Sequence, residues 1–186
     1  MKLNNKKSGF TLAEVLVTLM IIGVIAAMTI PSLMQTTAQQ EYKAAFKKAL
    51  SLLNQTITLS YAIDGIDATD ATGTNFYDFL TQRLNVMSSV PEEQELYTAD
   101  GMWFKVMLTG ERTSQRATNC SKNLTDGNLN TGGNICSIVK VDVNGAKGPN
   151  TWTESSKKIK DLFEITVYPQ SALPANKVFA EALYSK

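Results

Sequence analysis

The chain has 186 residues, of which 44% are hydrophobic, and its formal net charge is +1. This length indicates one domain with room for an appendage. The chain contains no histidine, which excludes a Ser-His-Asp or Cys-His catalytic device and a histidine-containing zinc site. The near-neutral charge, with no basic face or stripe, gives no sign of a nucleic-acid partner.

The N-terminal segment is first basic and then apolar. Lys6 and Lys7 precede the junction Ser8-Gly9-Phe10, and no charged residue occurs from Val15 to Gln40. A charge-free run of about 18 residues or more is a candidate transmembrane helix, and the lysines before it favour a start on the cytoplasmic side. Glu14 is the one carboxylate at the head of this run, and an ionisable group in such a segment normally has a partner.

The residues around the junction also carry a family resemblance. Gly9-Phe10, followed by Thr11-Leu12 and Glu14, resembles the class III signal of type IV prepilins and type II secretion pseudopilins. The resemblance extends to about Leu50, with the basic leader, the Gly-Phe junction and the carboxylate at the family's spacing. It implies cleavage between Gly9 and Phe10 by a prepilin peptidase, N-methylation of the new Phe10 amine, and retention of the apolar helix in the mature protein.

The resemblance assigns roles to two residues inside the helix. Pro31 falls where the family has a helix-kinking proline, and a proline removes one backbone hydrogen bond of a helix. For Glu14 the resemblance implies a role in assembly, because the Phe10 amine of a neighbouring subunit could reach its carboxylate in a filament. The alternative is that Glu14 lies at the level of the lipid headgroups as a favourable residue of the first helical turn.

An ordinary secretory signal, cleaved near Ala26-Ala27, is the rival interpretation of this segment, but Glu14 would then lie inside its apolar region. The prepilin interpretation divides the chain into a removed leader (1–9), a transmembrane and assembly half of a long helix (10–34), and a globular headpiece that includes the second half of that helix (35–186). Removing the three lysines of the leader leaves 15 basic and 17 acidic residues.

A single helix is expected from Phe10 to about Tyr61. Beyond Gln40 its apolar residues recur every three or four positions and so form one face; they are Tyr42, Phe46, Leu50, Leu53, Ile57 and Tyr61. The other side carries Lys43, Lys47, Lys48, Asn54 and Gln55. An apolar face of this kind needs a globular partner, and the turn pair Asp64-Gly65 ends the helix.

The rest of the chain predicts shorter elements. In order, the pattern indicates a loop over 66–73, a helix over 75–87, strands over 102–108, 138–143 and 162–168, an exposed loop over 119–134 and a short helix over 176–184. Helices followed by strands indicate an α+β fold, in which about three antiparallel strands cover the second half of the long helix. The resemblance implies the same pilin-like lollipop, with the apolar half of the helix protruding from the headpiece.

Two cysteines, Cys120 and Cys136, flank the asparagine-rich loop. In an oxidising compartment a disulfide is the natural interpretation, and two free thiols are the alternative. Closing a loop of about 15 residues stabilises a fold by roughly 3 kcal/mol in the chain-entropy model.

Two further groups of residues are candidate ligand sites. Asp142, Asn144 and Asp161 surround the Asn144-Gly145 turn, and their oxygen atoms are of the kind that holds Ca²⁺, as some similar pseudopilins do in a headpiece loop. The spacing is not that of an EF-hand, so turn-forming side chains are the favoured explanation, and no cofactor is expected. Trp103 and Trp152 could stack on DNA, but the few lysines beside them favour core packing or a subunit contact.

The sequence therefore predicts a non-enzymatic subunit, a minor pilin or pseudopilin of a type IV pilus or type II secretion pseudopilus. Expected partners are the prepilin peptidase/N-methyltransferase, other pilin subunits in a helical filament, and membrane lipid before assembly. The expected location is the bacterial cytoplasmic (inner) membrane, as a single pass with the headpiece outside the cytoplasm, and then the pilus or pseudopilus. The alternatives are a competence-type minor pilin that contacts DNA or a surface, and a membrane-anchored ligand-binding domain that does not polymerise.

Overall fold

The structure is a computed structural model of the chain, and it describes residues 9–66, 68, 74–107 and 135–184. The chain divides into two compact units, Met1–Ala38 and Gln39–Lys186. Helix α1 (Leu12–Asp64) contributes residues to both units. The expected leader, residues 1–9, lies outside the described residues except for Gly9.

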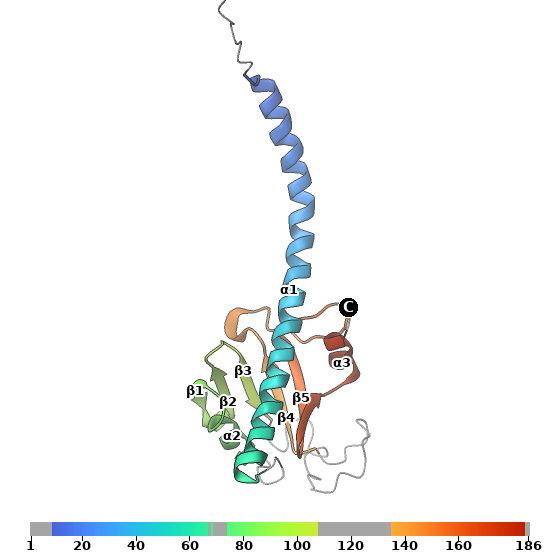
Figure 1. The fold of residues 1–186 in the computed structure, drawn as a ribbon. Helices are drawn as coiled ribbons and strands as arrows, with labels where there is room; N and C mark the ends of the chain where they lie inside the picture. Colours follow the sequence, from blue (N-terminus) through green and yellow to red (C-terminus); the bar gives the residue numbers. More distant parts are fainter. Residues whose placement is uncertain (1–8, 67, 69–73, 108–134, 185–186) are drawn as a thin grey trace, which may run out of the picture. The chain divides into compact units, whose positions relative to one another are not determined.

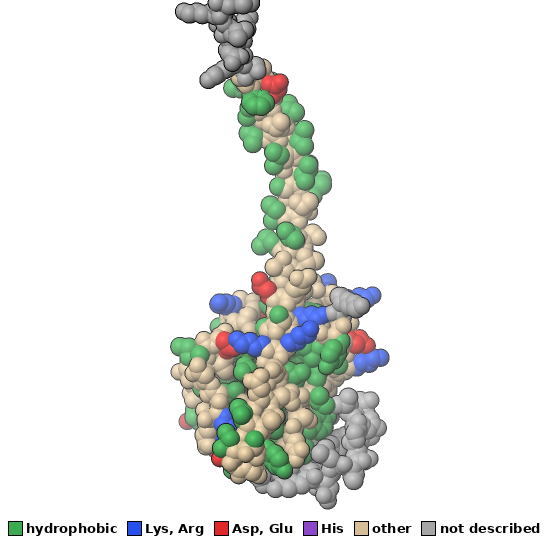
Figure 2. All heavy atoms as spheres, in the orientation of Figure 1, with side chains coloured by type: hydrophobic (Ala, Val, Ile, Leu, Met, Phe, Trp, Pro, Cys, Tyr) green, Lys and Arg blue, Asp and Glu red, His purple; other side chains and the backbone are tan. Residues whose placement is uncertain are grey.

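The first unit consists of the apolar part of α1. Its large hydrophobic side chains are exposed, and Figure 2 shows them on all visible sides of the helix. By length and composition this helix is sufficient to cross a membrane. An apolar surface of this extent requires lipid or other apolar helices around it.

The second unit contains a six-stranded antiparallel sheet (Figure 1), whose strands follow one another in sequence order. They are β1 (Val86–Val90), β2 (Glu95–Thr98), β3 (Trp103–Val106), β4 (Ser137–Asp142), β5 (Leu162–Tyr168) and β6 (Ser171–Pro174). The remaining elements are α2 (Thr74–Thr81), α3 (Lys177–Tyr184) and the 3₁₀ turns η1 (Pro91–Glu93) and η2 (Gly145–Lys147). This arrangement confirms the predicted α+β class.

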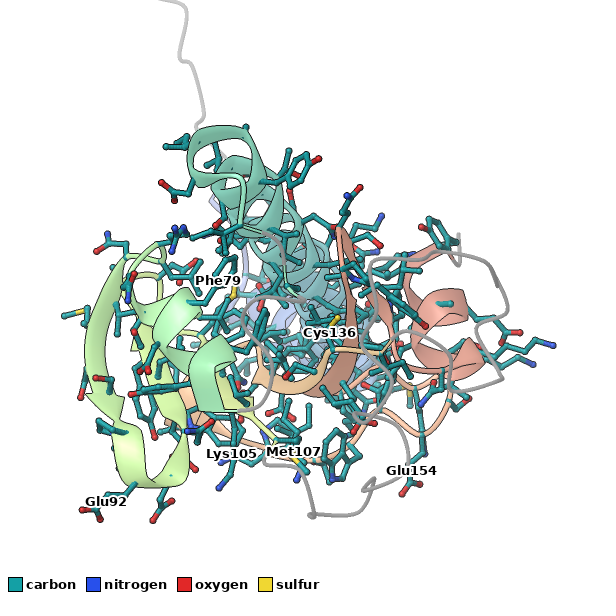
Figure 3. All side chains as sticks on the ribbon, turned by 90° about the horizontal axis from the view of Figure 1, so that it is seen from below. Phe79, Glu92, Lys105, Met107, Cys136 and Glu154 are labelled. Atoms are coloured by element: carbon teal, nitrogen blue, oxygen red, sulfur yellow. The ribbon has the colours of Figure 1, made fainter. Side chains whose placement is uncertain are left out.

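The core of the second unit lies between the later part of α1 and one face of the sheet (Figure 1). The rings of Phe46 on α1 and Phe163 on β5 stack with centroids 4.0 Å apart, and Phe179 of α3 meets Phe163 edge-on at 5.8 Å. Aromatic pairs in these geometries add about 0.5 to 1.5 kcal/mol beyond the apolar area they bury. Figure 3 shows Phe79 and Cys136 inside this unit, and Glu92 and Glu154 at its surface.

The predicted apolar face of α1 is only partly the buried one. Phe46, Leu53 and Ile57 are fully buried, whereas Tyr61 is 52% exposed. The small residues Ala49, Thr56 and Ser60 complete the buried line instead. Helical spacing predicts burial for the bulky side chains. Small side chains are buried as well, because they allow α1 to approach the sheet more closely.

Asn54, predicted on the polar side of the helix, joins α1 to the edge strand β6. Its amide nitrogen donates to the Ala172 carbonyl oxygen at 2.9 Å, and its carbonyl oxygen accepts from the Ala172 N–H at 2.9 Å. Because both bonds go to one residue, they fix the position of α1 along the sheet.

Two predictions about the other elements were wrong. The helix expected over 75–87 ends at Thr81, and the chain then enters β1 at Val86. The sheet has six strands rather than about three, because β1, β2 and β6 are short hairpin partners. Strands of four or five residues offer too few alternating positions to be distinguished from loops. The strand over 162–168 is confirmed, and those over 102–108 and 138–143 and the last helix are confirmed within two residues.

Candidate processing and assembly site

The predicted cleavage junction lies immediately before α1. Phe10 is 90% exposed, and a Cβ added to Gly9 would meet nothing within 4 Å. Both sides of the Gly9-Phe10 peptide bond are therefore accessible in the described chain. Within the described residues, nothing lies close to Gly9, so the backbone of the junction is open to an enzyme.

Glu14 and Thr11 form a reciprocal cap at the N-terminus of α1. The Glu14 carboxylate accepts from the Thr11 N–H and from the Thr11 hydroxyl, each at 2.8 Å. In return the Glu14 N–H donates to the Thr11 hydroxyl oxygen at 3.3 Å. This is a capping box, which satisfies N–H groups that the first helical turn leaves without partners.

The sequence predicts a role for Glu14 but no partner for it inside its own chain. The signal for that partner is present, since threonine followed three residues later by glutamate before an apolar run is a helix-start pattern. Thr11 was noticed only as part of the family motif. The capping bonds orient the Glu14 carboxylate toward the chain end that cleavage would create, one residue before Thr11.

The polar side chains between Val15 and Ile30 are satisfied within the helix. The Thr18 hydroxyl donates to the Val15 carbonyl oxygen at 2.9 Å, and the Thr29 hydroxyl donates to that of Ile25 at 3.0 Å. Hydroxyls bonded in this way can enter an apolar environment at a reduced cost. Pro31 lies inside α1, two residues beyond Thr29, and the kink expected there stays a prediction.

The predicted disulfide involves one described residue. Cys136 is buried, and its N–H donates to the Val167 carbonyl oxygen of β5 at 2.8 Å. Cys120 lies outside the described residues, as does the loop predicted over 119–134. The bond between the two cysteines therefore stays a prediction.

The three candidate calcium ligands, Asp142, Asn144 and Asp161, lie close together but are engaged in turns. Asp161 is fully buried and accepts from the N–H groups of Asn150 at 2.7 Å and Thr151 at 2.8 Å. Asp142 accepts from the Asn144 N–H at 3.2 Å. Within the described part of the chain, no three cysteine, aspartate or glutamate residues form a group able to hold a metal ion. These bonds agree with the turn-forming explanation, and calcium binding stays a prediction.

The two tryptophans are half-buried, and Trp103 lies on the sheet face that α1 does not cover. Trp103 donates from its ring nitrogen to the Glu95 carboxylate at 3.1 Å. The Lys140 ammonium lies 5.7 Å from the centre of the Trp152 ring. Trp152 also contacts the core, so the expectation of packing is met for this residue, whereas Trp103 lines a pocket.

Comparison with known families identifies the N-terminal segment. The family model described as "Prokaryotic N-terminal methylation motif" matches residues 4–30. Neither the curated proteins nor the solved structures give a match. The match spans the junction, the capping box and most of the apolar run, and the helix that follows the junction suits a membrane-anchored pilin. Residues 4–30 therefore carry the prepilin-type cleavage and methylation signal, which indicates a precursor of the type IV pilin or pseudopilin kind.

Proposed function

We propose that this chain is a minor structural subunit of a type IV pilus or of a type II secretion pseudopilus. A prepilin peptidase cleaves it between Gly9 and Phe10 and methylates the Phe10 amine. Before assembly the subunit resides in the cytoplasmic membrane with one membrane-spanning helix and with residues 35–186 outside the cytoplasm. It then joins the filament through α1. The observation that carries this proposal is the methylation motif over 4–30, joined to a helix whose apolar side chains are exposed.

The apolar part of α1 supplies the main attraction between subunits. Its exposed side chains include Leu16, Leu19, Ile21, Ile22 and Ile25, each more than half exposed. Burying such a side chain contributes about 1.5 to 3 kcal/mol relative to water. Lipid covers these side chains before assembly, so van der Waals packing and small residues such as Gly23 favour neighbouring helices over lipid.

Glu14 supplies the direction and register of assembly. Its carboxylate lies in the first turn of α1, where the helix dipole favours a negative charge. A methylated amine on the Phe10 of the next subunit is a positively charged partner of the right kind. Removing one member of a buried, hydrogen-bonded charge pair costs about 2 to 5 kcal/mol, so this pair would decide whether a subunit is retained.

Three substitutions separate the charge of Glu14 from its capping role. Glu14→Gln keeps a side-chain oxygen for the Thr11 N–H but removes the charge. Thr11→Ala removes the two bonds of the Thr11 hydroxyl but keeps the charge, and Glu14→Ala removes the charge together with the two bonds that the carboxylate accepts. We expect both Glu14 variants to enter filaments at least about tenfold less than the parent chain. Thr11→Ala should enter normally, since a lost cap costs only about 1 kcal/mol. Incorporation is measured as the share of subunit cross-linked into filaments, with membrane insertion as the control.

Processing is tested on the same material by N-terminal mass spectrometry. The parent chain should begin at a methylated Phe10, and Gly9→Val should keep residues 1–9. A parent chain that keeps its leader would contradict the proposed processing. Normal incorporation of Glu14→Ala into filaments would remove the assembly role of Glu14, whereas a parent chain never found in filaments would favour the membrane-anchored domain that does not polymerise. A subunit found only at filament tips, with DNA or a surface bound, would favour the competence-type alternative.

A further inference from the structure

The sheet face turned away from α1 carries a row of side chains in matched register. Tyr97 of β2 pairs with Trp103 of β3, Trp103 pairs with Asp142 of β4, and Asp142 pairs with Leu162 of β5. Their neighbours in sequence, such as Leu96, Phe104 and Val141, are fully buried in the core. Since successive residues of a strand point to opposite faces, the row lies on the other side of the sheet.

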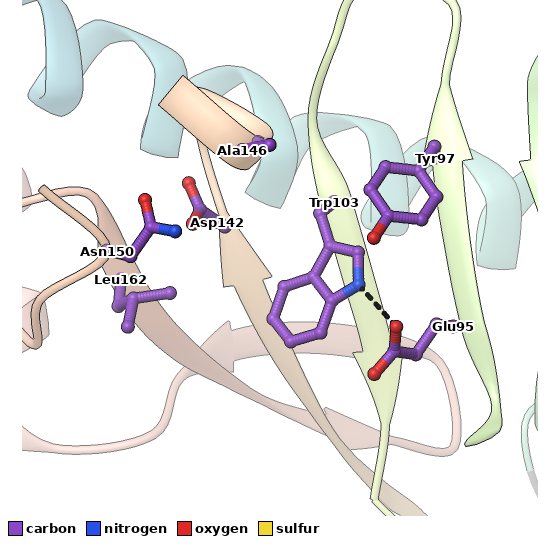
Figure 4. Close-up of a pocket in the computed structure, with 8 residues that line it drawn as sticks. Glu95, Tyr97, Trp103, Asp142, Ala146, Asn150 and Leu162 are labelled. Atoms are coloured by element: carbon purple, nitrogen blue, oxygen red, sulfur yellow. Dashed lines mark hydrogen bonds between the residues drawn. The ribbon is translucent and has the colours of Figure 1, made fainter. Parts of the chain in front are cut away.

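These four side chains form one wall of a pocket (Figure 4). Its volume is about 310 Å³, and Glu95, Gly145, Ala146 and Asn150 complete its lining. Gly145 and Ala146 belong to η2, which follows β4 and lies beside the row. A pocket of this size holds a small organic molecule or one long side chain.

The two acidic residues of the pocket differ in how their charge is balanced. Both oxygens of Glu95 are engaged: one accepts from the Trp103 ring N–H at 3.1 Å, and the other accepts from the Lys105 ammonium at 3.1 Å. Asp142 is 4% exposed, and the bond that it accepts from the Asn144 N–H comes from a neutral group. Among the described residues, the charged group that acts on Asp142 is the carboxylate of Asp161, which repels it. Within this part of the chain, the pocket therefore holds surplus negative charge at Asp142.

We propose that this pocket binds a small organic ammonium ion, with the positive group between the Asp142 carboxylate and the ring of Trp103. A cation over an aromatic face is attracted by the ring, more strongly where water is displaced. Neutral and anionic ligands would leave the Asp142 charge uncompensated. A hard metal ion would need six or more oxygen ligands, whereas indole, phenol and Leu162 form much of this lining.

The test uses the full-length chain in a non-ionic detergent, so that no cationic headgroup competes. Choline is titrated against 3,3-dimethylbutan-1-ol, which has the same shape without the charge, and binding is followed by calorimetry and by Trp103 fluorescence in a Trp152→Phe background. We expect choline to bind at least about tenfold more tightly than the neutral alcohol. Butylammonium, which mimics a lysine side chain, is titrated in parallel. Tighter binding of butylammonium would indicate a lysine side chain as the ligand, and tighter binding of choline would indicate a free quaternary amine.

Matched variants locate the binding. Asp142→Asn and Trp103→Leu should each weaken choline binding at least about tenfold. Asp100→Asn is the control, because Asp100 pairs with Lys48 at 2.7 Å and lies outside this pocket. Equal affinity for choline and the alcohol, or undiminished binding to Asp142→Asn, overturns the proposal. So does Ca²⁺ binding that excludes choline, which would make the site one for a hard metal ion. The test does not depend on filament assembly, so its failure leaves the proposed function standing.

Discussion

Asp142 lies at the end of β4, in surroundings that disfavour the ionised form of its carboxyl group. Burial and the nearby carboxylate of Asp161 raise its pKa from 3.8 to about 6, although the N–H groups of Asn144 and Gly145 partly offset this. Between about pH 4 and pH 6 the folded chain therefore holds a proton that the unfolded chain has released. Where the folded state binds more protons, the free energy of unfolding falls as the pH rises.

Asp142→Asn should remove this pH dependence while keeping an oxygen that accepts from the Asn144 N–H. Relative to the parent chain, the variant should gain on the order of 2 to 3 kcal/mol of unfolding free energy between about pH 4 and pH 7.5. The measurement is denaturant unfolding in non-ionic detergent, followed by tryptophan fluorescence at both pH values. Asp78→Asn, at an exposed position on α2, is the control. A difference that stays constant with pH would show that Asp142 is not the titrating group.

At the residue scale, the functional residues that belong to a short motif could be predicted from the sequence, whereas contacts between residues far apart in the sequence could not. Gly9, Phe10 and Glu14 were recognised because their spacing is short and local. Thr11 was equally local, but its bonds with Glu14 became visible only in the structure. Asn54 and Ala172 are 118 positions apart, and nothing in the sequence of α1 indicates where β6 will lie.

At the scale of the elements, Gly145 of η2 approaches the backbone between β2 and β3 more closely than any other described glycine approaches a neighbour. A Cβ on Gly145 would lie 2.6 Å from the carbonyl oxygen of Gly101, and Gly145 has a φ of +63°. Gly65, after α1, has a φ of +68° but open space around it. The two glycines share the conformational requirement, whereas only Gly145 has the steric one.

Alanine substitution at each glycine separates the two effects. Gly65→Ala should destabilise by about 1 to 2 kcal/mol, the cost of a left-handed conformation for a residue with a side chain. Gly145→Ala should cost a further 1 to 3 kcal/mol or so, because η2 must move away from the turn between β2 and β3. Denaturant midpoints of the two variants give the comparison. Equal losses would mean that η2 moves without penalty.

The elements differ in how well they can be predicted from their own sequences. β5 has seven residues with a clear alternation, and its predicted bounds were right. β2 and β6 have four residues each, and they are strands because neighbouring strands supply their hydrogen bonds. The segment 82–87 continued a helical pattern, but Val86 pairs with Thr98 instead. In these places tertiary pairing outweighs local preference.

For the whole molecule, the predicted disulfide offers a test of the compartment in which the second unit folds. If Cys120 and Cys136 are joined, reduction should lower the free energy of unfolding by about 3 kcal/mol. Cys120→Ser is the better control variant, since Cys136 is 1% exposed and a hydroxyl there would add a burial cost of its own. In that variant, reduction should change nothing. Two titratable thiols in the unreduced, denatured parent chain would contradict the bond.

The threonines of the apolar run have a consequence for how one subunit is told from another. Between Val15 and Ile30 the polar side chains are Thr18 and Thr29, and both hydroxyls donate to backbone carbonyl oxygens of the same helix. Along that stretch α1 offers a neighbour only aliphatic surface, without a directional bond. If the chain assembles as proposed, helices of this composition are interchangeable partners along this stretch, and chains with different headpieces can share one lattice. The preference of such a subunit for a particular neighbour would then come from Glu14 and from the residues after Ile30.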